Sequence, residues 1–214
     1  MIIDNIDNLS DLQKDALKEL GTMGAGHAAS ALTEFLNQII FMKVPSVQII
    51  EVNKIPNVLK TRFRAEAQLA ISSANNLTEL YYTVLVLFDK ETVNEILDQK
   101  SPPSDDIEAI MEYSTLTMSL IKEIGSIILL KIVSTLNQFL NVSGAFPSIP
   151  ELRIGILDSL LLNELKEFQP DSKVIFIKCD VFSEDKAEIR ADCIFIPHME
   201  TCDRFFGALF TQYL

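Results

Sequence analysis

The sequence predicts a single mixed α/β domain that is built from two similar halves. The chain has 214 residues, of which 48% are hydrophobic and 22% charged, a composition typical of one folded globular domain. Both halves show the same predicted order of elements: a long helix, then strands, then a short helix. Residues 18–23 (KELGTM) also match residues 122–127 (KEIGSI). We therefore expect one domain over residues 1–214 with an internal repeat, about 10–100 and about 105–212.

The first half begins with a segment of helical character. Residues 10–13 (SDLQ) have the form of a capping box, and from Leu17 onward apolar residues recur at helical spacing, which predicts a helix over about 10–38. Val44 and Pro45 are expected to end this helix or to lie in the loop after it, because the residue before a proline avoids the helical conformation. The runs beyond it predict strands at 46–52, 64–71 and 81–88, and then a short helix at 91–97.

The second half comes after a cluster of helix breakers at residues 101–106 (SPPSDD), which we expect to link the halves. A second long helix is predicted from there to about Leu140. Its apolar part carries Lys122, Glu123 and Lys131, so we expect a buried helix and not a membrane span. Further strands are predicted at 152–157, 173–179 and 188–196, and a last helix at 200–210.

The net charge and the cysteines limit the kinds of partner and the cellular compartment that we expect. Eighteen Lys and Arg residues oppose 30 Asp and Glu residues, and the resulting net charge of −12 repels nucleic acids and anionic membranes. Cys179, Cys193 and Cys202 include no CxxC pair, so they predict neither a disulfide framework nor a zinc ribbon. The N-terminus lacks the basic region of a signal peptide. We expect a cytoplasmic protein with no nucleic-acid partner and no membrane insertion.

The repeated motif places a carboxylate beside a small hydroxyl in each half. Glu19 and Thr22, like Glu123 and Ser126, are three residues apart, and such residues share one face of a helix. Residues 21–26 also give the first helix a smooth, glycine-rich patch. Two interpretations stay open for this patch: tight packing of helix on helix within the fold, or a surface where a partner protein docks.

Two other patterns are weaker. Residues 24–29 (GAGHAA) fit a loose dinucleotide-binding pattern, but that pattern has meaning only between a strand and the start of a helix, and here a helix precedes it. His198, Cys202 and Cys193 have no standard zinc spacing. His27 stands alone, and a lone histidine is more often structural than catalytic. We expect the chain to have no cofactor of its own.

These residues resemble the CheC/CheX/FliY family of chemotaxis proteins, and CheC most in length and duplication. The family motif is Asp or Ser, three residues, Glu, two residues, Asn, then 22 residues and Pro. The first copy reads Asp15, Glu19, Thr22 and Pro45 with this spacing, and the second reads Ser119, Glu123 and Ser126, with Pro150 one position late.

The resemblance implies a fold of α+β type and an activity. Two long helices would pack on one face of a mostly antiparallel sheet, in two pseudo-symmetric halves. Such proteins dephosphorylate a CheY-type response regulator: the helix docks, Glu bonds the regulator's lysine, and the Asn amide orients the attacking water. Mg²⁺ is expected on the regulator. The resemblance also implies a CheD-type deamidase as a partner.

The sequence departs from the family at the amide. Thr22 and Ser126 stand where Asn is expected, and a hydroxyl is shorter and lacks the rigid donor and acceptor of an amide. Glu19, Thr22, Glu123 and Ser126 are therefore the candidate catalytic residues of a phosphatase with weakened activity. The candidate binding residues around them are Asp15, Lys18, Ser119, Lys122 and Pro45.

Three functions remain open from the sequence. The first is a phosphatase that tolerates a hydroxyl in place of the amide. The second is a non-catalytic binding module that sequesters the regulator or regulates a CheD-type deamidase. The third is a structural role in the flagellar switch, which is weakened because the chain has no room for an additional switch-ring domain. Lys14 and Lys18 near Glu19 favour a protein partner with an acidic pocket, unless they are ordinary solvated charges.

Overall fold

Two long helices, several short ones and six strands make up the described part of the chain. The computed structural model describes residues 10–60, 67–75, 82–89, 115–139, 141, 148–166, 168–183, 189–197 and 207. The helices are α1 (Asp11–Leu36), the 3-10 turn η2 (Val52–Lys54), α2 (Ile55–Lys60), α5 (Thr115–Phe139) and α6 (Leu157–Leu165). The strands are β1 (Ile40–Glu51), β2 (Ala67–Asn75), β3 (Tyr82–Asp89), β4 (Glu151–Ile156), β5 (Lys173–Ser183) and β6 (Ile189–Pro197). Within these residues, no helix is long and apolar enough to span a bilayer.

The six strands form one antiparallel sheet with the order β1-β5-β6-β3-β2-β4. Read from the opposite edge, this order is unchanged when each strand of the first half is exchanged for its counterpart in the second, β1 for β4, β2 for β5 and β3 for β6. The central pair, β3 and β6, therefore lies on a pseudo-twofold axis. An internal repeat of about 10–100 and about 105–212, as we propose, would have this symmetry.

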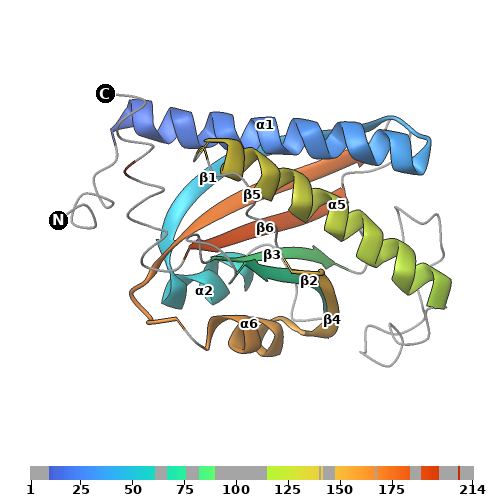
Figure 1. Cartoon of the computed structure of the whole chain (residues 1–214). Coiled ribbons are helices and arrows are strands. Elements are labelled where there is room, and N and C mark those ends of the chain that lie inside the picture. Colours follow the sequence, from blue (N-terminus) through green and yellow to red (C-terminus); the bar gives the residue numbers. More distant parts are fainter. Residues whose placement is uncertain are drawn as a thin grey trace.

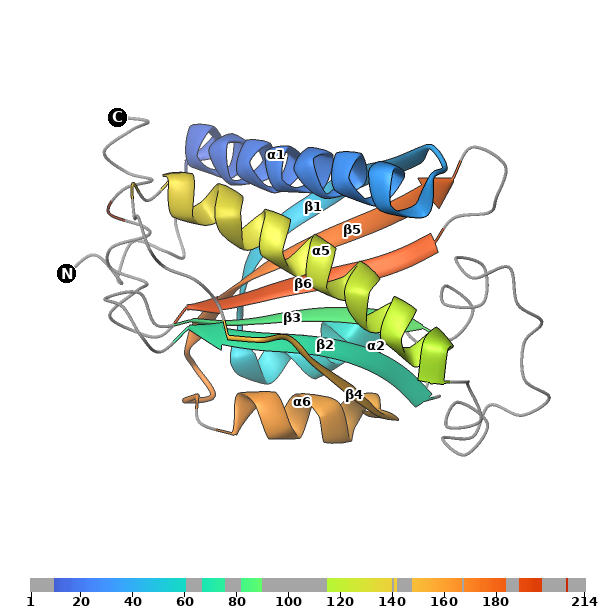
Figure 2. The same ribbon diagram turned by 45° about the vertical axis from the view of Figure 1, so that its right-hand side comes forward.

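Helices cover both faces of the sheet. The long helices α1 and α5 lie side by side on one face, and the short helices α2 and α6 lie on the other (Figures 1 and 2). Because side chains alternate along a strand, β3 serves both layers. Val84 and Val86 belong to the core under the long helices, whereas Leu85 and Leu87 belong to the core under the short ones. The expected mixed fold with long helices on an antiparallel sheet is thus confirmed.

Glycines bring α1 close to its neighbours. A Cβ added at Gly24 would lie 3.3 Å from the Cα of Ile132 in α5, and one added at Gly21 would lie 3.0 Å from a methyl group of Val47 in β1. A Cβ at Gly26 would meet nothing within 4 Å. Of the three glycines in this patch, Gly21 and Gly24 are therefore packed inside the fold, and only Gly26 faces open space.

Pro45 occupies a different place from the one expected. It lies inside β1, which starts at Ile40, and not at the end of the helix or in a loop. The pairing of β1 with β5 shifts register between Lys43 and Ser46. A proline cannot donate to the ladder, and it is tolerated at such an irregularity in an edge strand. The strand continues past the proline because β1 is an edge strand, and its outer edge pairs with no other described strand.

Two short helices have no counterpart in the sequence-based predictions. Helix α2 is six residues long and is held by Ile55 and Leu59, which are fully buried in the second core. Helix α6 begins at Leu157, a residue expected to end a strand. Helices this short have little intrinsic stability, so burial of their apolar residues decides their conformation.

The other predicted helices and strands either correspond to observed elements or fall outside the described residues. The expected helix at 10–38 and the strands at 81–88, 173–179 and 188–196 correspond to α1, β3, β5 and β6. The strands expected at 46–52, 64–71 and 152–157 overlap β1, β2 and β4 with shifted ends. The linker at 101–106 and the short helix at 91–97 lie outside the described residues, as does the helix at 200–210 except for the helical Gly207.

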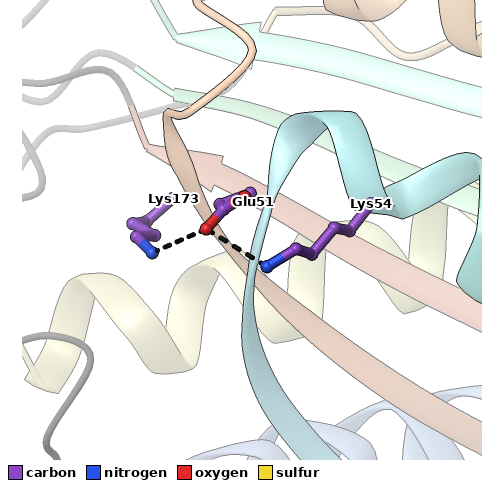
Figure 3. A network of polar contacts seen from close by, with 3 residues as sticks. All are labelled: Glu51, Lys54 and Lys173. Atoms are coloured by element: carbon purple, nitrogen blue, oxygen red, sulfur yellow. Dashed lines mark hydrogen bonds and ion pairs between the residues drawn. The ribbon is translucent and has the colours of Figure 1, made fainter.

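An ion-pair network fixes the end of the edge strand β1. Glu51 is paired with Lys173 across the β1–β5 ladder at 3.4 Å and with Lys54 of the following turn at 3.2 Å (Figure 3). The Glu51 side chain is 27% exposed. The hydrogen bonds from Lys54 and Lys173 lower the pKa of Glu51 below its ordinary value of 4.5. The charged form of Glu51 thus helps hold β1 to β5.

We expect Gly24→Ala and Gly26→Ala to have different effects on stability. Gly26→Ala should raise the free energy of unfolding by about 1 kcal/mol, since alanine favours the helix and meets no neighbour. Gly24→Ala should be about 1–3 kcal/mol less stable than Gly26→Ala, because its methyl group presses on the backbone of α5. Urea denaturation of both variants measures the difference, and equal stabilities would contradict the packing described.

We expect Glu51→Gln to lower the urea midpoint at pH 7, because it removes the charge that both lysines bind. A carboxyl group with a lowered pKa in the folded state stabilises the fold above its unfolded pKa, and this stabilisation is lost as the pH falls through the folded pKa. The difference between wild type and variant should therefore narrow as the pH is lowered past 4.5. A difference that stays constant down to about pH 3, below the usual range for a carboxyl group, would argue against the network.

Candidate functional site

The outer face of α1 carries the first copy of the motif. Asp15, Glu19, Thr22 and Gly26 are all exposed, and their spacing of three or four residues puts them in one row along the helix. Among the described residues, no cation lies within ion-pair distance of Glu19. This row, which we call the α1 ridge, therefore presents an unneutralised carboxylate next to a hydroxyl.

The outer face of α5 carries the second copy. Ser119 and Glu123 are exposed, but Lys122 is half-buried and Ser126 is only 8% exposed. No ion pair to Glu123 exists within the part of the chain that the structure describes. In the second copy, the carboxylate is therefore exposed and the hydroxyl is buried.

Both hydroxyls are bonded to their own helices. Thr22 Oγ1 donates to the carbonyl oxygen of Lys18 at 2.8 Å, and Ser126 Oγ donates to that of Lys122 at 2.6 Å. This bond to the fourth preceding residue is common for Ser and Thr within helices. Because the proton is used there, each oxygen retains only acceptor capacity toward a second molecule.

The charged residues near the first copy and Pro45 lie on different sides of α1. Lys18 is exposed on α1, and Lys14 is paired with Asp11 at 3.4 Å. Pro45 does not join the ridge. Its neighbours Val44 and Val47 lie close to Gly21, on the inner face of α1. The structure thus separates Pro45 from the other candidate residues.

His27 has a structural contact that no sequence pattern indicates. Thr135 Oγ1 donates to the carbonyl oxygen of Lys131 at 3.0 Å, so its lone pair is available to accept from His27 Nδ1 at 3.1 Å. This arrangement assigns the proton to Nδ1 and links α1 to α5. The sequence does not pair these two residues, because they meet only where the helices cross.

The metal and dinucleotide patterns that the sequence suggests do not form sites within the described residues. Within them, no three His, Cys, Asp or Glu side chains come together as a metal site would require. Cys193 is buried, and burial, followed by the charges of Cys179 and Asp192, raises the pKa of its thiol. His198 and Cys202 lie outside the described residues. Residues 24–29 lie in the middle of α1, which excludes the strand-to-helix turn of a dinucleotide site.

Comparison with known proteins finds similarity to chemotaxis and flagellar-switch proteins. The model of the CheC-like family matches residues 12–49, which include α1 and most of β1. The CheY-P phosphatase CheC of Bacillus subtilis is 24% identical over 204 residues, which are 94% of this chain and 95% of that protein. The flagellar motor switch phosphatase FliY of the same organism is 40% identical over 53 residues, 25% of this chain and 14% of its own.

Solved structures show the same fold. Thermotoga maritima FliY superposes with a TM-score of 0.71 at 18% identity, covering 97% of this chain and 100% of that one. The middle domain of FliM from H. pylori superposes with a TM-score of 0.63 at 10% identity, covering 94% and 99%. This likeness shows the fold. The sequence matches show similarity to the CheC-like family over residues 12–49 and to CheC over nearly the whole chain.

We expect Thr135→Val to lower the free energy of unfolding by about 0.5–1.5 kcal/mol, because it removes the hydroxyl that links His27 to α5. In a double-mutant cycle with His27→Ala, the two losses should not add, since both variants break the same bond. Thr22→Val is a matched control, because it removes an exposed bond of the same type without a histidine. If the losses of unfolding free energy in Thr135→Val and His27→Ala add up in the double variant, the hydrogen bond between them does not contribute to stability.

Proposed function

We propose that the protein docks through its long helices on a phosphorylated CheY-type response regulator and promotes or modulates its dephosphorylation. The observation that supports this most is the exposure of Glu19 on the α1 ridge at the motif spacing, with no intramolecular partner among the described residues. The relation to a CheY-P phosphatase over nearly the whole chain supports the choice of partner. Lys18, exposed on the same helix, adds a positive charge next to the ridge that suits an acidic pocket.

Hydrolysis of the phosphoaspartate requires no covalent intermediate with this chain. A water oxygen attacks the phosphorus of the phosphoaspartate, the bond to the aspartate oxygen breaks, and inorganic phosphate and the free carboxylate result. Catalysis of such a transfer depends on the position of the water and on neutralising charge. We assign Mg²⁺ and the leaving carboxylate to the regulator. Glu19 would accept a hydrogen bond from the regulator's lysine and so set the position of the ridge.

Thr22 would act on the water as an acceptor only. Its proton is donated to the carbonyl oxygen of Lys18. Its oxygen can therefore accept one hydrogen bond from the water, but the hydroxyl has no proton for a second contact. An Asn amide reaches about one bond further and supplies both. Because a displacement of about 1 Å can cost on the order of 100-fold in rate, we propose a weak activity.

A second candidate function is a binding module without catalysis. The bonding of both hydroxyls to their own helices supports it, since neither is free to orient a water as an amide does. In this function the chain would sequester the phosphorylated regulator or regulate a CheD-type deamidase. If the partner is the regulator, the two candidates share the docking surface and differ only in whether docking leads to hydrolysis.

We expect the wild-type protein to accelerate the decay of a phosphorylated CheY-type regulator only weakly, and Thr22→Asn to increase the rate about 10-fold or more. The physical reason is that Asn restores the longer amide on an exposed position of the ridge. The measurement is loss of ³²P from the regulator over time, with protein in excess. Thr22→Val serves as the control, because it has the same shape as threonine but no acceptor.

The result separates the candidates. A rate in the wild type equal to that of an Asn-bearing relative would contradict the proposed weakening. Stable binding with no acceleration, even in Thr22→Asn, would favour the binding module. Absence of both binding and acceleration would refute the proposed function.

A further inference from the structure

The two copies of the motif match in residue type but differ in their surroundings. We infer that the copy on α1 alone contacts the reacting centre of the regulator, and that the copy on α5 is closed to it. The inference rests on the proposed function, because it assigns that docking to one of two similar helices.

The first observation concerns the hydroxyls. Thr22 is exposed, whereas Ser126 is 8% exposed and holds a 2.6 Å bond to the carbonyl oxygen of Lys122. A side chain with almost no accessible surface cannot touch a water that a second protein holds unless its helix moves. The second copy therefore offers only the Glu123 carboxylate, and a single exposed ion pair contributes little to binding.

The second observation concerns the residue one turn further along each helix. In α1 this is Gly26, where an added Cβ would meet nothing within 4 Å, so the backbone is bare beside Thr22. In α5 the same place is taken by Leu130, which is 41% exposed. Residues four apart lie one above the other, so Leu130 projects beside Ser126. A surface that lies flat on α1 would be held away from α5.

The two observations point the same way. Ser126 is only 8% exposed, and the step from Gly26 to Leu130 is a difference in the sequence itself. The repeat thus retains two carboxylates and one accessible site. A leucine placed at position 26 would give α1 the obstacle that α5 carries, and its Cβ would meet nothing within 4 Å.

The test measures binding of each variant to the receiver domain of a CheY-type regulator held in its active form by beryllofluoride and Mg²⁺. We expect Glu19→Arg and Gly26→Leu each to weaken the Kd by about 10-fold or more. Glu123→Arg should change it by about 2-fold or less. Glu34→Arg makes the same change of charge at an exposed position of α1 outside the ridge and is the control. Circular dichroism checks that each variant folds.

Each outcome bears either on the choice of helix or on docking itself. If Glu123→Arg weakens binding as much as Glu19→Arg, or more, the inference is overturned and the proposed function stands. If Gly26→Leu binds as the wild type does, the α1 ridge is not the contact surface and the inference is likewise overturned. If the wild-type protein does not bind the active receiver domain at all, the proposed function itself fails.

Discussion

The contact of Gly24 with the backbone of Ile132 determines how the two long helices sit on the sheet. It lets α1 lie against α5 so closely that both helices can cover the same face of one six-stranded sheet. Once the inner face of α1 is committed to α5 and β1, its rotation is set, and Asp15, Glu19 and Thr22 must point outward. The surface that we propose for docking is thus a consequence of packing on the opposite side of the helix.

The same helical repeat gives two carboxylate ridges, and their differences come from the neighbours of each helix. An exposed carboxylate alone binds weakly, so a docking surface needs complementary shape and a neighbouring polar group as well. On α1 these conditions are met by an exposed hydroxyl and a bare backbone at Gly26. On α5 the buried Ser126 and the projecting Leu130 remove them. A duplicated fold can therefore keep its symmetry in the core while its two surfaces take separate roles.

The sequence predicts the elements whose pattern is strong and fails where tertiary contacts decide. Helix α1 and strand β3 are long runs with clear periodicity, and the predicted ends of both agree with the structure to within about two residues. The prediction for Pro45 is wrong because an irregular edge strand accepts a proline, and no local signal marks that irregularity. Matching residue types predict equal sites at Thr22 and Ser126, but Thr22 is exposed whereas Ser126 is only 8% exposed. Likewise, Gly24 and Gly26 look alike in the sequence and face opposite sides of α1.

The proposed docking of α1 on the active form of a response regulator can be located residue by residue in solution. The decisive experiment is chemical-shift mapping of the isotopically labelled protein, with and without the beryllofluoride-activated receiver domain. If α1 is the contact surface, the largest changes fall on the α1 ridge around Glu19, Thr22 and Gly26, with small changes on α2, α6 and β4. Changes that concentrate on the short helices or on the β4 edge, with α1 unaffected, would rule out docking through α1.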